Sequence, residues 1–320
     1  MNPVVSVVMP LYNNEREVAR TVCSVLDQKI QDFELIVVDD GSTDAGPGVV
    51  RGFGDSRIQI VPQGNAGVSA ARNRGIEMAR SDIVAFLDAD DEWHPNFLKI
   101  ILDLTEKFPD CSVFATSYWI ANFKAGNRRA VLRGLPPNFE EGILERYFEV
   151  ALSSDPPLCS STIAVRRPAI KAIGGFPVGV ATGEDLLTWA RLAVAYNIAY
   201  SITPLAIVWE PEEISSRPGR VPETPDRVGE ALAQLIVQCG SAAPPGIADY
   251  LGHWHRMRGV IFLRLGDSRR AMSELATAMH LAGMRARFLM LFAISLLPGP
   301  GARLLYDALK RLAFLRMKSD

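Results

Sequence analysis

Apolar runs and segments with helical spacing alternate along the first two thirds of the chain. Continuous β-branched and apolar runs predict buried strands at 4–9, 33–38, 58–61, 83–87, 112–120, 161–165 and 198–208. Between the runs, apolar positions recur every three or four residues, which predicts helices at 15–29, 49–53, 68–80, 95–108, 140–152, 167–173 and 184–196. Strands that alternate with helices favour an α/β fold, with a doubly wound, mostly parallel sheet and right-handed crossovers.

The pattern changes after residue 209. Residues 210–226 are dense in Pro, Glu, Arg and Ser, which predicts a linker, and everything from 227 onward has helical spacing. Within it, 255–281 predicts an αα-hairpin that turns at Gly266-Asp267, with no second copy at a fixed period to indicate a repeat array. We therefore expect an α/β domain over 1–216 and a helical C-terminal region over 217–320.

Composition narrows the class of protein. The 320 residues are 48% hydrophobic and 22% charged, which is typical of a globular protein, and the formal net charge of −2 gives no reason to expect a nucleic-acid partner. The four cysteines are dispersed and fit a reducing compartment. The N-terminus does not resemble a signal peptide, and no apolar run reaches the ~18 residues of a spanning helix, so we expect a cytoplasmic location.

The C-terminal tail leaves two interpretations open. Residues 285–318 combine apolar stretches with the cations Arg303, Lys310, Arg311, Arg316 and Lys318. Such a cationic, amphipathic segment is suited to peripheral contact with the inner face of the cell membrane. It is equally suited to packing on the domain with its charges in water.

The strand at 83–87 runs directly into three carboxylates, Asp88, Asp90 and Asp91. In an open α/β sheet, ligands bind beyond the carboxyl ends of the strands. Crowded carboxylates repel one another, and a divalent cation with a preference for oxygen ligands, Mg²⁺ or Mn²⁺, removes that repulsion. The alternative is a solvated acidic turn in which Asp91 caps the next helix.

Two other strand ends carry residues suited to a nucleotide. Tyr12 can stack on a planar base, and Asp40 can accept a hydrogen bond from a ring N–H. Arg72, in the helix after the third strand, can hold a diphosphate with a planar fork of donors. Taken singly, Tyr12 is better explained as a loop aromatic that covers the sheet edge, and Arg72 as a surface salt bridge. Their occurrence at consecutive strand ends favours a common site.

Four motifs in order resemble the family 2 glycosyltransferases with the GT-A fold. They are Val-Val-Met-Pro-Leu-Tyr-Asn (7–13), Leu-Ile-Val-Val-Asp-Asp-Gly-Ser-Thr-Asp (35–44), Gly-Val-Ser-Ala-Ala-Arg-Asn (67–73) and Phe-Leu-Asp-Ala-Asp-Asp (86–91). The resemblance continues through Ser160-Ser161-Thr162, Gly174-Gly175-Phe176 and Gly183-Glu184-Asp185, and so covers roughly residues 3 to 216.

The resemblance implies a metal-dependent, inverting transfer of a sugar from a nucleotide-diphosphate donor to a glycan or lipid-linked acceptor. It implies metal and ribose–diphosphate contacts for Asp88 and Asp90. It also implies a base, most often uracil, read by Asp40.

The resemblance places Pro10 and Tyr12 in the loop that lines the base pocket. It places the catalytic base on Asp185, which would accept the proton of the acceptor hydroxyl. From the residues alone, Glu184-Asp185 is better explained as an ordinary acidic pair at a helix N-terminus.

Glu210 marks a departure from the family. It stands where many members carry a His close to the metal or diphosphate. A carboxylate could bind the metal but would repel the diphosphate, so Glu210 stays outside the predicted site, and reduced activity becomes an alternative.

Three other functions are alternatives to a glycosyltransferase. A phosphohydrolase should carry Asp-x-Asp on its first strand, whereas here the motif follows a later one. A dinucleotide-binding dehydrogenase should carry Gly-x-Gly-x-x-Gly after the first strand, and the sequence has none there. A nucleotide-sugar-binding or scaffolding protein of a polysaccharide assembly system remains open, although Asp88, Asp90 and Asp185 argue for an enzyme.

Overall fold

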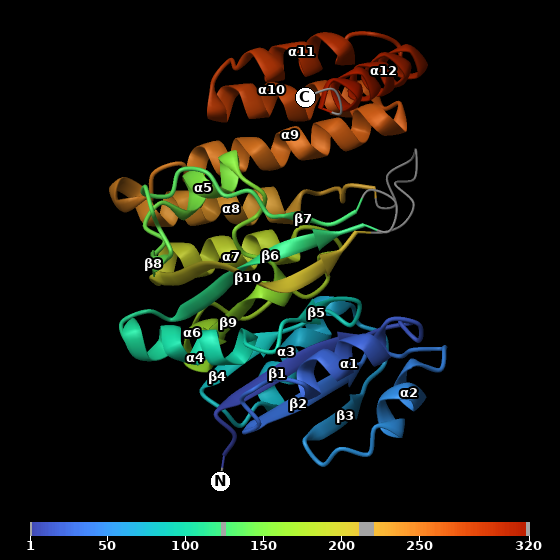
Figure 1. The fold of residues 1–320 in the computed structure, drawn as a ribbon. Coiled ribbons are helices and arrows are strands. Elements are labelled where there is room, and N and C mark those ends of the chain that lie inside the picture. The colour runs from blue at the N-terminus through green and yellow to red at the C-terminus, as the bar shows by residue number, and fades with distance from the viewer. Residues whose placement is uncertain (1, 123–125, 211–220, 318–320) are drawn as a thin grey trace. The chain divides into compact units, whose positions relative to one another are not determined.

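The computed structural model describes residues 2–122, 126–210 and 221–317, with side chains described as far as residue 309. The chain forms two compact units, Met1–Glu212 and Glu213–Asp320, here called the α/β unit and the helical unit. Figure 1 draws the helical unit in orange and red. Most of the linker expected at 210–226 falls on residues 211–220, outside the described residues.

The α/β unit is built on one ten-stranded sheet with the order β3-β2-β1-β4-β9-β6-β10-β5, with β7 beside β6 and β8 beside β10. The strands are β1 (Val5–Leu11), β2 (Phe33–Asp39), β3 (Ile58–Pro62), β4 (Ile83–Phe86), β5 (Glu92–Trp93), β6 (Val113–Ala121), β7 (Arg128–Arg129), β8 (Glu141–Ile143), β9 (Ile163–Arg166) and β10 (Ile198–Trp209). Strands β3, β2, β1 and β4 run parallel, and β9 is antiparallel to β4 and β6. The expected mostly parallel, doubly wound sheet is confirmed.

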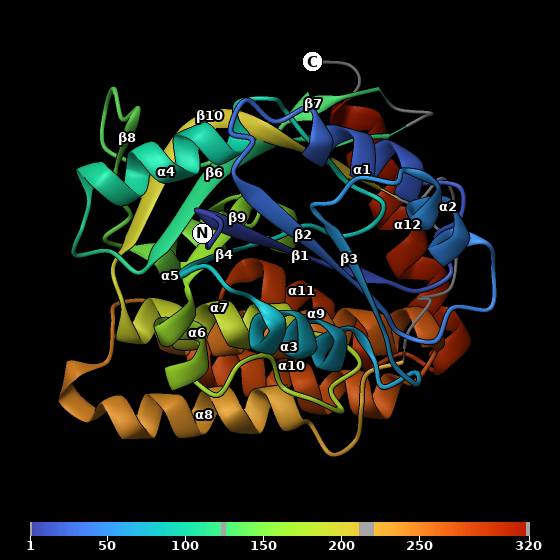
Figure 2. The ribbon, with the colours of Figure 1, turned by 90° about the horizontal axis from the view of Figure 1, so that it is seen from below.

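Helices cover both faces of the sheet, and Figure 2 shows α1 and α4 on one side and α3, α6 and α7 on the other. The helices of this unit are α1 (Val18–Leu26), α2 (Gly46–Gly52), α3 (Val68–Met78), α4 (Phe97–Lys107), α5 (Tyr147–Ser153), α6 (Arg167–Ala172) and α7 (Glu184–Ala195), with a 3₁₀ turn at Ser160–Thr162. Because both faces are covered, the central strands read as unbroken apolar runs.

Close packing of α3 on β1 sets the geometry at the strand ends. A Cβ at Gly75 of α3 would lie 2.3 Å from Cγ1 of Val8 in β1, so only glycine permits this approach. Arg72 lies one turn earlier on the same helix, and Val8 lies on the strand that leads to Pro10 and Tyr12. The backbone therefore brings these sequence motifs to one edge of the sheet.

The helix expected at 140–152 is wrong over its first part. Residues 141–143 form β8, which pairs antiparallel with β10, and the helix α5 begins only at Tyr147. The backbone of β10 offers hydrogen-bonding groups on this side, and the segment satisfies them. Local helical spacing cannot report on such a partner strand.

The helical unit contains α8 (Arg227–Cys239), a 3₁₀ turn (Gly240–Ala242), α9 (Ile247–Leu265), α10 (Ser268–Ala282), α11 (Ala286–Ser295) and α12 (Gly299–Met317). The expected αα-hairpin is confirmed by α9 and α10. Gly266 ends α9 in the left-handed conformation (φ 79°), and Asp267 caps α10 by accepting a hydrogen bond from the Arg270 N–H at 3.0 Å. Phe262, Leu275 and Leu291 pack in the core of this unit.

Candidate functional site

Arg72 is a buried cation that joins distant parts of the α/β unit. It is 3% exposed, and its Nη2 donates to Oδ1 of Asp88 at 2.6 Å, while Nη1 lies 3.6 Å from Oε1 of Glu184. Burial by itself lowers the pKa of a guanidinium, but the Asp88 carboxylate and those at the start of α7 raise the pKa of Arg72 above its usual value. Arg72 is therefore no surface salt bridge, and it ties the end of β4 to the start of α7.

Asn73 and Phe176 fix the position of Arg72. The Asn73 side chain donates from Nδ2 to the carbonyl of Phe176 at 2.8 Å and accepts from the Phe176 N–H at 2.8 Å. A Cβ on Gly175 would lie 2.5 Å from Asn73 Oδ1, and Gly175 has a φ of 69°. The guanidinium carbon of Arg72 lies 5.1 Å from the centre of the Phe176 ring. The Asn73–Phe176 contact thus explains why Gly174-Gly175-Phe176 belongs to the site.

Asp185 lies in the first turn of α7, directly after Glu184. Gly183 precedes the helix in the left-handed conformation, and Asp185 Oδ1 accepts a hydrogen bond from the Leu186 N–H at 2.6 Å. Burial raises the pKa of Asp185 above its ordinary value, and the nearby Arg72 opposes that rise. A carboxylate with a raised pKa binds a proton more readily, which suits a general base.

Asp91 is buried and anchors the acidic turn. Its Oδ2 accepts from the Ser161 hydroxyl at 2.5 Å, and its Oδ1 accepts from the Trp209 N–H at 2.9 Å. The Ser161 hydroxyl oxygen in turn accepts from the Asp88 N–H at 3.1 Å. Because Asn96 is the residue that precedes α4, the alternative in which Asp91 caps this helix is wrong.

Asp90 is exposed and lines a cleft of about 880 Å³, here called the Asp90 cleft. The ends of β1, β2, β4 and β10 all contribute to it. Its lining residues are Asn13, Asn14, Glu15, Arg16, Glu17, Arg20, Thr43, Asp44, Asp90, Trp209 and Glu210. Two hydrogen bonds join the segment after β1 to the segment after β2. The Thr43 N–H donates to Asn13 Oδ1 at 2.8 Å, and the Glu15 N–H donates to Asp44 Oδ2 at 2.8 Å.

A Trp–Arg–Glu contact forms the wall beside Asp90. Arg20 Nε lies 2.9 Å from Glu92 Oε1, and its guanidinium carbon lies 4.3 Å from the centre of the Trp209 ring. Trp209 Nε1 donates to the same Glu92 oxygen at 2.8 Å, and Arg20 Nη2 donates to the Asp90 carbonyl at 2.8 Å. The contact between these three residues could not be predicted from the sequence, because no motif marks them and only the fold brings them together.

Asp40 organises the loop that leads into α3. Its Oδ1 accepts from Gln63 Nε2 at 2.8 Å and from the Ala66 N–H at 2.9 Å, and its Oδ2 accepts from the Gly67 N–H at 2.8 Å. Asp40 is only 4% exposed. Asp40 therefore fixes the start of the helix that carries Arg72.

Pro10 and Tyr12 lie at the end of the neighbouring strand. Pro10 pairs with Val38 of β2 in the sheet, and Tyr12 directly follows β1 with 49% of its surface exposed. The backbone of Asp40 donates to the carbonyl of Leu11 at 2.9 Å, so the two strand ends are joined beside Tyr12.

The donor set at the acidic turn suits a hard divalent cation. Asp90, Glu210 and the partly exposed Asp88 offer carboxylate oxygens, the ligands that Mg²⁺ and Mn²⁺ prefer. Loss of hydration and then the charge of Asp88 raise the pKa of Asp90. Within the described residues, no Lys or Arg forms an ion pair with the Asp90 carboxylate, whereas Asp88 is paired with Arg72. Asp90 is therefore a candidate metal ligand, whereas among the described residues three possible ligand atoms come within 4.8 Å of one another only at Asp226, His255 and Glu274.

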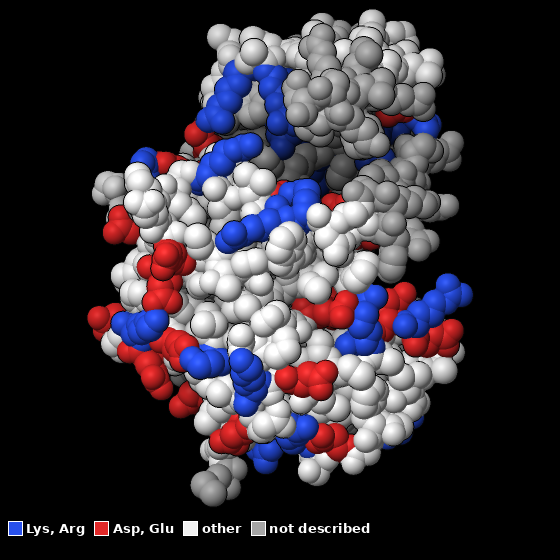
Figure 3. All heavy atoms as spheres, viewed as in Figure 1, with Lys and Arg blue, Asp and Glu red and all other residues white. Residues whose placement is uncertain are grey.

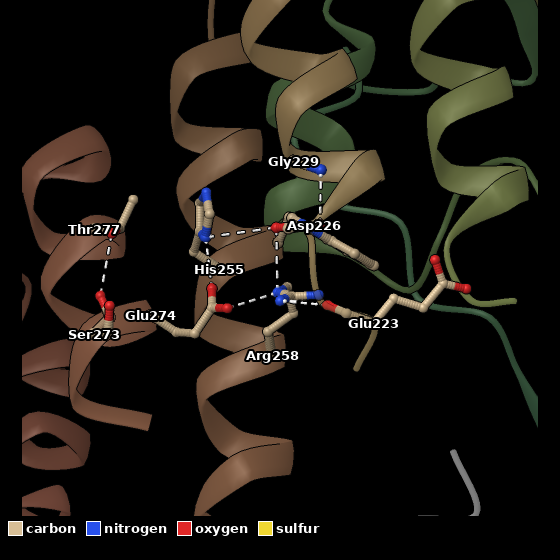
Figure 4. A network of polar contacts seen from close by, with 9 residues as sticks. Glu223, Asp226, Gly229, His255, Arg258, Ser273, Glu274 and Thr277 are labelled. Atoms are coloured by element: carbon tan, nitrogen blue, oxygen red, sulfur yellow. Dashed lines mark hydrogen bonds and ion pairs between the residues drawn. The ribbon is translucent and has the colours of Figure 1, made fainter. Parts of the chain in front are cut away.

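A second group of carboxylates lies in the helical unit, where the ligand atoms of Asp226, His255 and Glu274 are within 4.8 Å of one another. Figure 4 shows Arg258 between the two carboxylates. Its Nε lies 3.2 Å from Asp226 Oδ2 and 2.8 Å from Glu274 Oε1. Because the buried Arg258 already pairs with both carboxylates, we assign this group to the stability of the helical unit.

A sequence profile of Glycosyl transferase family 2 matches residues 6–174, more than half of the chain. The chain belongs to glycosyltransferase family 2. The match begins in β1 and ends just before Gly175, so it includes Arg72 and Asp88 but not Phe176 or Glu184.

Curated relatives are similar over the first part of the chain. The putative teichuronic acid biosynthesis glycosyltransferase TuaG of Bacillus subtilis is 39% identical over 119 residues, which is 36% of this chain and 47% of TuaG. The glucosyltransferase WfgD of Escherichia coli is 38% identical over 105 residues, 32% of this chain and 42% of WfgD. The matches to the Bacillus subtilis glycosyltransferases EpsH, EpsJ and TuaG span 27% to 47% of their lengths.

Solved structures share the fold over nearly the whole chain. S. aureus TarS in complex with UDP-GlcNAc has a TM-score of 0.68 at 18% identity, covering 97% of this chain and 92% of that one. The mannosyltransferase PcManGT from Pyrobaculum calidifontis, in complex with GDP-Man and Mn²⁺, has a TM-score of 0.55 at 18% identity, covering 96% and 88%. These likenesses identify the GT-A fold that the motifs implied.

Proposed function

We propose that this family 2 glycosyltransferase moves a sugar from a UDP-sugar donor to a hydroxyl of a glycan or lipid-linked acceptor, in a metal-dependent, inverting reaction of polysaccharide biosynthesis. The observation that carries the proposal is the position of Arg72. It holds Asp88, at the end of β4, close to the carboxylates at the start of α7. This contact supports a single site for Asp88 and Asp185, which are 97 positions apart in sequence.

Asp185 has the role of general base in this proposal. Its carboxylate accepts the proton of the acceptor hydroxyl while the hydroxyl oxygen attacks the anomeric carbon and the bond to the diphosphate breaks. The raised pKa of Asp185 favours proton uptake at this moment. Arg72 keeps Asp185 from taking up a proton too early, because its charge lowers that pKa.

Asp88 and Asp90, which face the diphosphate in this proposal, would hold the metal. A Mg²⁺ or Mn²⁺ ion there would neutralise the negative charge that develops on the leaving diphosphate. Arg72 adds a fixed positive charge on the same side. Glu210 also lines the Asp90 cleft and would be a further oxygen ligand, with one oxygen accepting from Asn122 Nδ2 at 3.3 Å.

The base of the nucleotide is assigned to the β1 and β2 ends. Tyr12 offers an exposed ring for stacking, and Pro10 stiffens the strand end that carries it. Asp40 fixes the loop at 63–67 by accepting from the Gly67 N–H, and in this proposal its carboxylate also accepts from a ring N–H. TarS in complex with UDP-GlcNAc supports UDP as the nucleotide.

The proposed class of acceptor is supported by the name of one relative. The printed name of WfgD describes a UDP-Glc:alpha-D-GlcNAc-diphosphoundecaprenol glucosyltransferase, whose acceptor carries a lipid. We extend a lipid-linked acceptor to this chain, which would then work at the cytoplasmic face of a membrane. Within the described residues, no helix is long and apolar enough to cross that membrane.

A thermal-shift screen tests the donor assignment. A ligand that binds only the native state stabilises it by about 2.7 kcal/mol at one hundred times its Kd. We expect UDP and one or more UDP-sugars to raise the melting temperature with Mn²⁺ and less so with EDTA, and the effect to be lost in Asp90→Ala. Stabilisation by GDP in place of UDP would reject uracil recognition, and stabilisation without turnover would favour the scaffolding alternative.

A further inference from the structure

The outward face of α11 is an unbroken apolar stripe. Leu289, Met290 and Ala293 of α11, together with Leu296 and Leu297 directly after it, have the helical spacing of one face, and all five are exposed. The four large side chains among them are 40–63% exposed. The opposite face of α11 already packs in the core of the helical unit through Leu291 and Ile294. The exposed face, here called the α11 stripe, is therefore not part of that core. A helix with an apolar face toward water as well as one toward the core is suited to a second apolar environment.

The same part of the chain is strongly cationic. Residues 284–318 hold seven of the 34 Lys and Arg residues but one of the 36 Asp and Glu residues. This segment therefore carries +6, while the remainder of the chain carries −8. Figure 3 shows Lys and Arg side chains around the surface formed by α10 and α11. The charge asymmetry indicates an anionic partner.

Further exposed apolar residues lie on the adjoining segments. Met284, just before α11, is 79% exposed, and Leu304 of α12 is 71% exposed. The exposed cations Arg285 and Arg287 stand at the first turn of α11. Large apolar side chains next to cations are the composition of helices that lie in the interface of a bilayer.

A second copy of the chain fits this surface less well. Two copies that meet through the same face by a two-fold axis would bring two segments of +6 together, and that repulsion opposes the apolar contact. An anionic bilayer offers both a negative surface and an apolar layer beneath it. The ten residues of α11 span about 15 Å, which suits a helix that lies along a membrane rather than across it.

We propose that the α11 stripe docks on an anionic membrane surface, with the stripe between the lipid headgroups and Arg287 beside the phosphates, whereas Arg285 is paired with Asp249 at 2.7 Å. The inference deepens the proposed function, because it names the surface through which an enzyme with a lipid-linked acceptor reaches its substrate. It concerns binding alone, however, and can hold or fail whatever the chemistry at Asp185.

Vesicle flotation of the full chain tests the inference. The chain should float with vesicles of phosphatidylcholine and phosphatidylglycerol, and not with phosphatidylcholine alone. The double variant Leu289→Ser/Leu296→Ser should bind about tenfold more weakly, since each substitution removes CH₂ groups from the buried face. Val237→Ser is the matched control, because Val237 is an exposed apolar residue on α8 of the same unit, at 79%.

Charge is tested separately. Arg287→Gln should weaken binding to the anionic vesicles about fivefold, because one cation beside an anionic surface contributes that fold-change. Arg51→Gln on α2 is the control and should not weaken binding. Equal flotation of the stripe variant and the wild type would overturn the inference, and so would a wild-type dimer that the stripe variant converts to a monomer. The stripe variant and Arg287→Gln should both release UDP at the wild-type rate without vesicles. This result separates a failure of docking from a failure of the proposed reaction.

Discussion

Arg72 and Asp91 show how single residues organise the site without being its reactive groups. Arg72 pairs with Asp88 and approaches Glu184, and so sets the spacing between the proposed metal-binding and proton-accepting ends. Asp91 holds the turn that carries Asp88 through Ser161. We therefore expect substitutions at these buried residues to act through the positions of their neighbours.

The pKa of Asp185 gives a prediction for the pH dependence of activity. Asp185 must be ionised to accept a proton, and burial raises its pKa above the ordinary value. Activity should therefore be full above the raised pKa and be lost as the pH falls through it. The measurement is kcat/KM against pH with saturating Mn²⁺. An acid limb at about 4, the value of an unperturbed aspartate, would contradict the assignment.

Asp91→Ala should destabilise the α/β unit and lower kcat. It leaves the buried Ser161 hydroxyl and the Trp209 N–H without their acceptor, which should cost about 2–3 kcal/mol in the free energy of unfolding. Chemical denaturation measures the loss, and Asp82→Ala is the control, because the Asp82 side chain is 82% exposed. If Asp91→Ala unfolds like the control, the anchoring role is wrong.

At the scale of elements, the site depends on contacts between segments that are distant in sequence. Helix α3 carries Arg72 and is fixed at its start by Asp40 of the β2 end and along its length by the approach of Gly75 to β1. The loop before α7 is fixed on α3 by the Asn73–Phe176 contact. Each element that carries a functional residue is thus held by another that also carries one.

Two adjacent glycines offer a matched test of the Asn73–Phe176 contact. Gly174 and Gly175 both have positive φ, but a Cβ on Gly174 would have no heavy atom within 4 Å, whereas one on Gly175 would overlap Asn73 Oδ1. Gly174→Ala should cost about 1 kcal/mol of backbone strain. Gly175→Ala should lower the melting temperature further and reduce activity, because it displaces the neighbour of Arg72. Equal effects of the two substitutions would exclude the contact as a determinant of the site.

The sequence predicts the strand ends well and the contacts between them poorly. Apolar runs reveal β1, β2 and β4, and the residues that follow them are therefore known to meet at one edge. The Arg20–Glu92–Trp209 contact and the role of Asp91 could not be predicted, because they depend on which face of α1 and which end of β10 turn toward the acidic turn. Strand β8 was missed for a similar reason, since its partner β10 lies more than fifty residues away.

At the scale of the whole molecule, two units with separate cores carry charges of opposite sign. The cationic segment at 284–318 belongs to the helical unit, whereas the carboxylates of the proposed active site belong to the α/β unit. The helical unit also has a buried ionic group of its own around Arg258 (Figure 4). Its stability should therefore respond to substitutions that leave the chemistry unaffected.

Arg258→Ala should destabilise the helical unit by about 3–5 kcal/mol, because Asp226 and Glu274 would remain buried without their cation. Thermal unfolding followed by circular dichroism should show an earlier loss of helix. The exposed Arg269→Ala on α10 serves as control and should change stability by less than about 0.5 kcal/mol. Stabilisation of Arg258→Ala by Zn²⁺ would instead indicate that the three remaining ligands can hold a metal.

The most direct test of the proposed reaction is the initial rate of UDP release from the UDP-sugar that stabilises the chain best, with Mn²⁺ and acceptor present. We predict that EDTA abolishes release and that Asp185→Asn lowers kcat about a thousandfold. Asp185→Asn should leave the Kd of UDP unchanged, because Asp185 is assigned to the acceptor and not to the nucleotide. Release that persists at the wild-type rate in Asp185→Asn, or that is indifferent to the metal, would contradict the account.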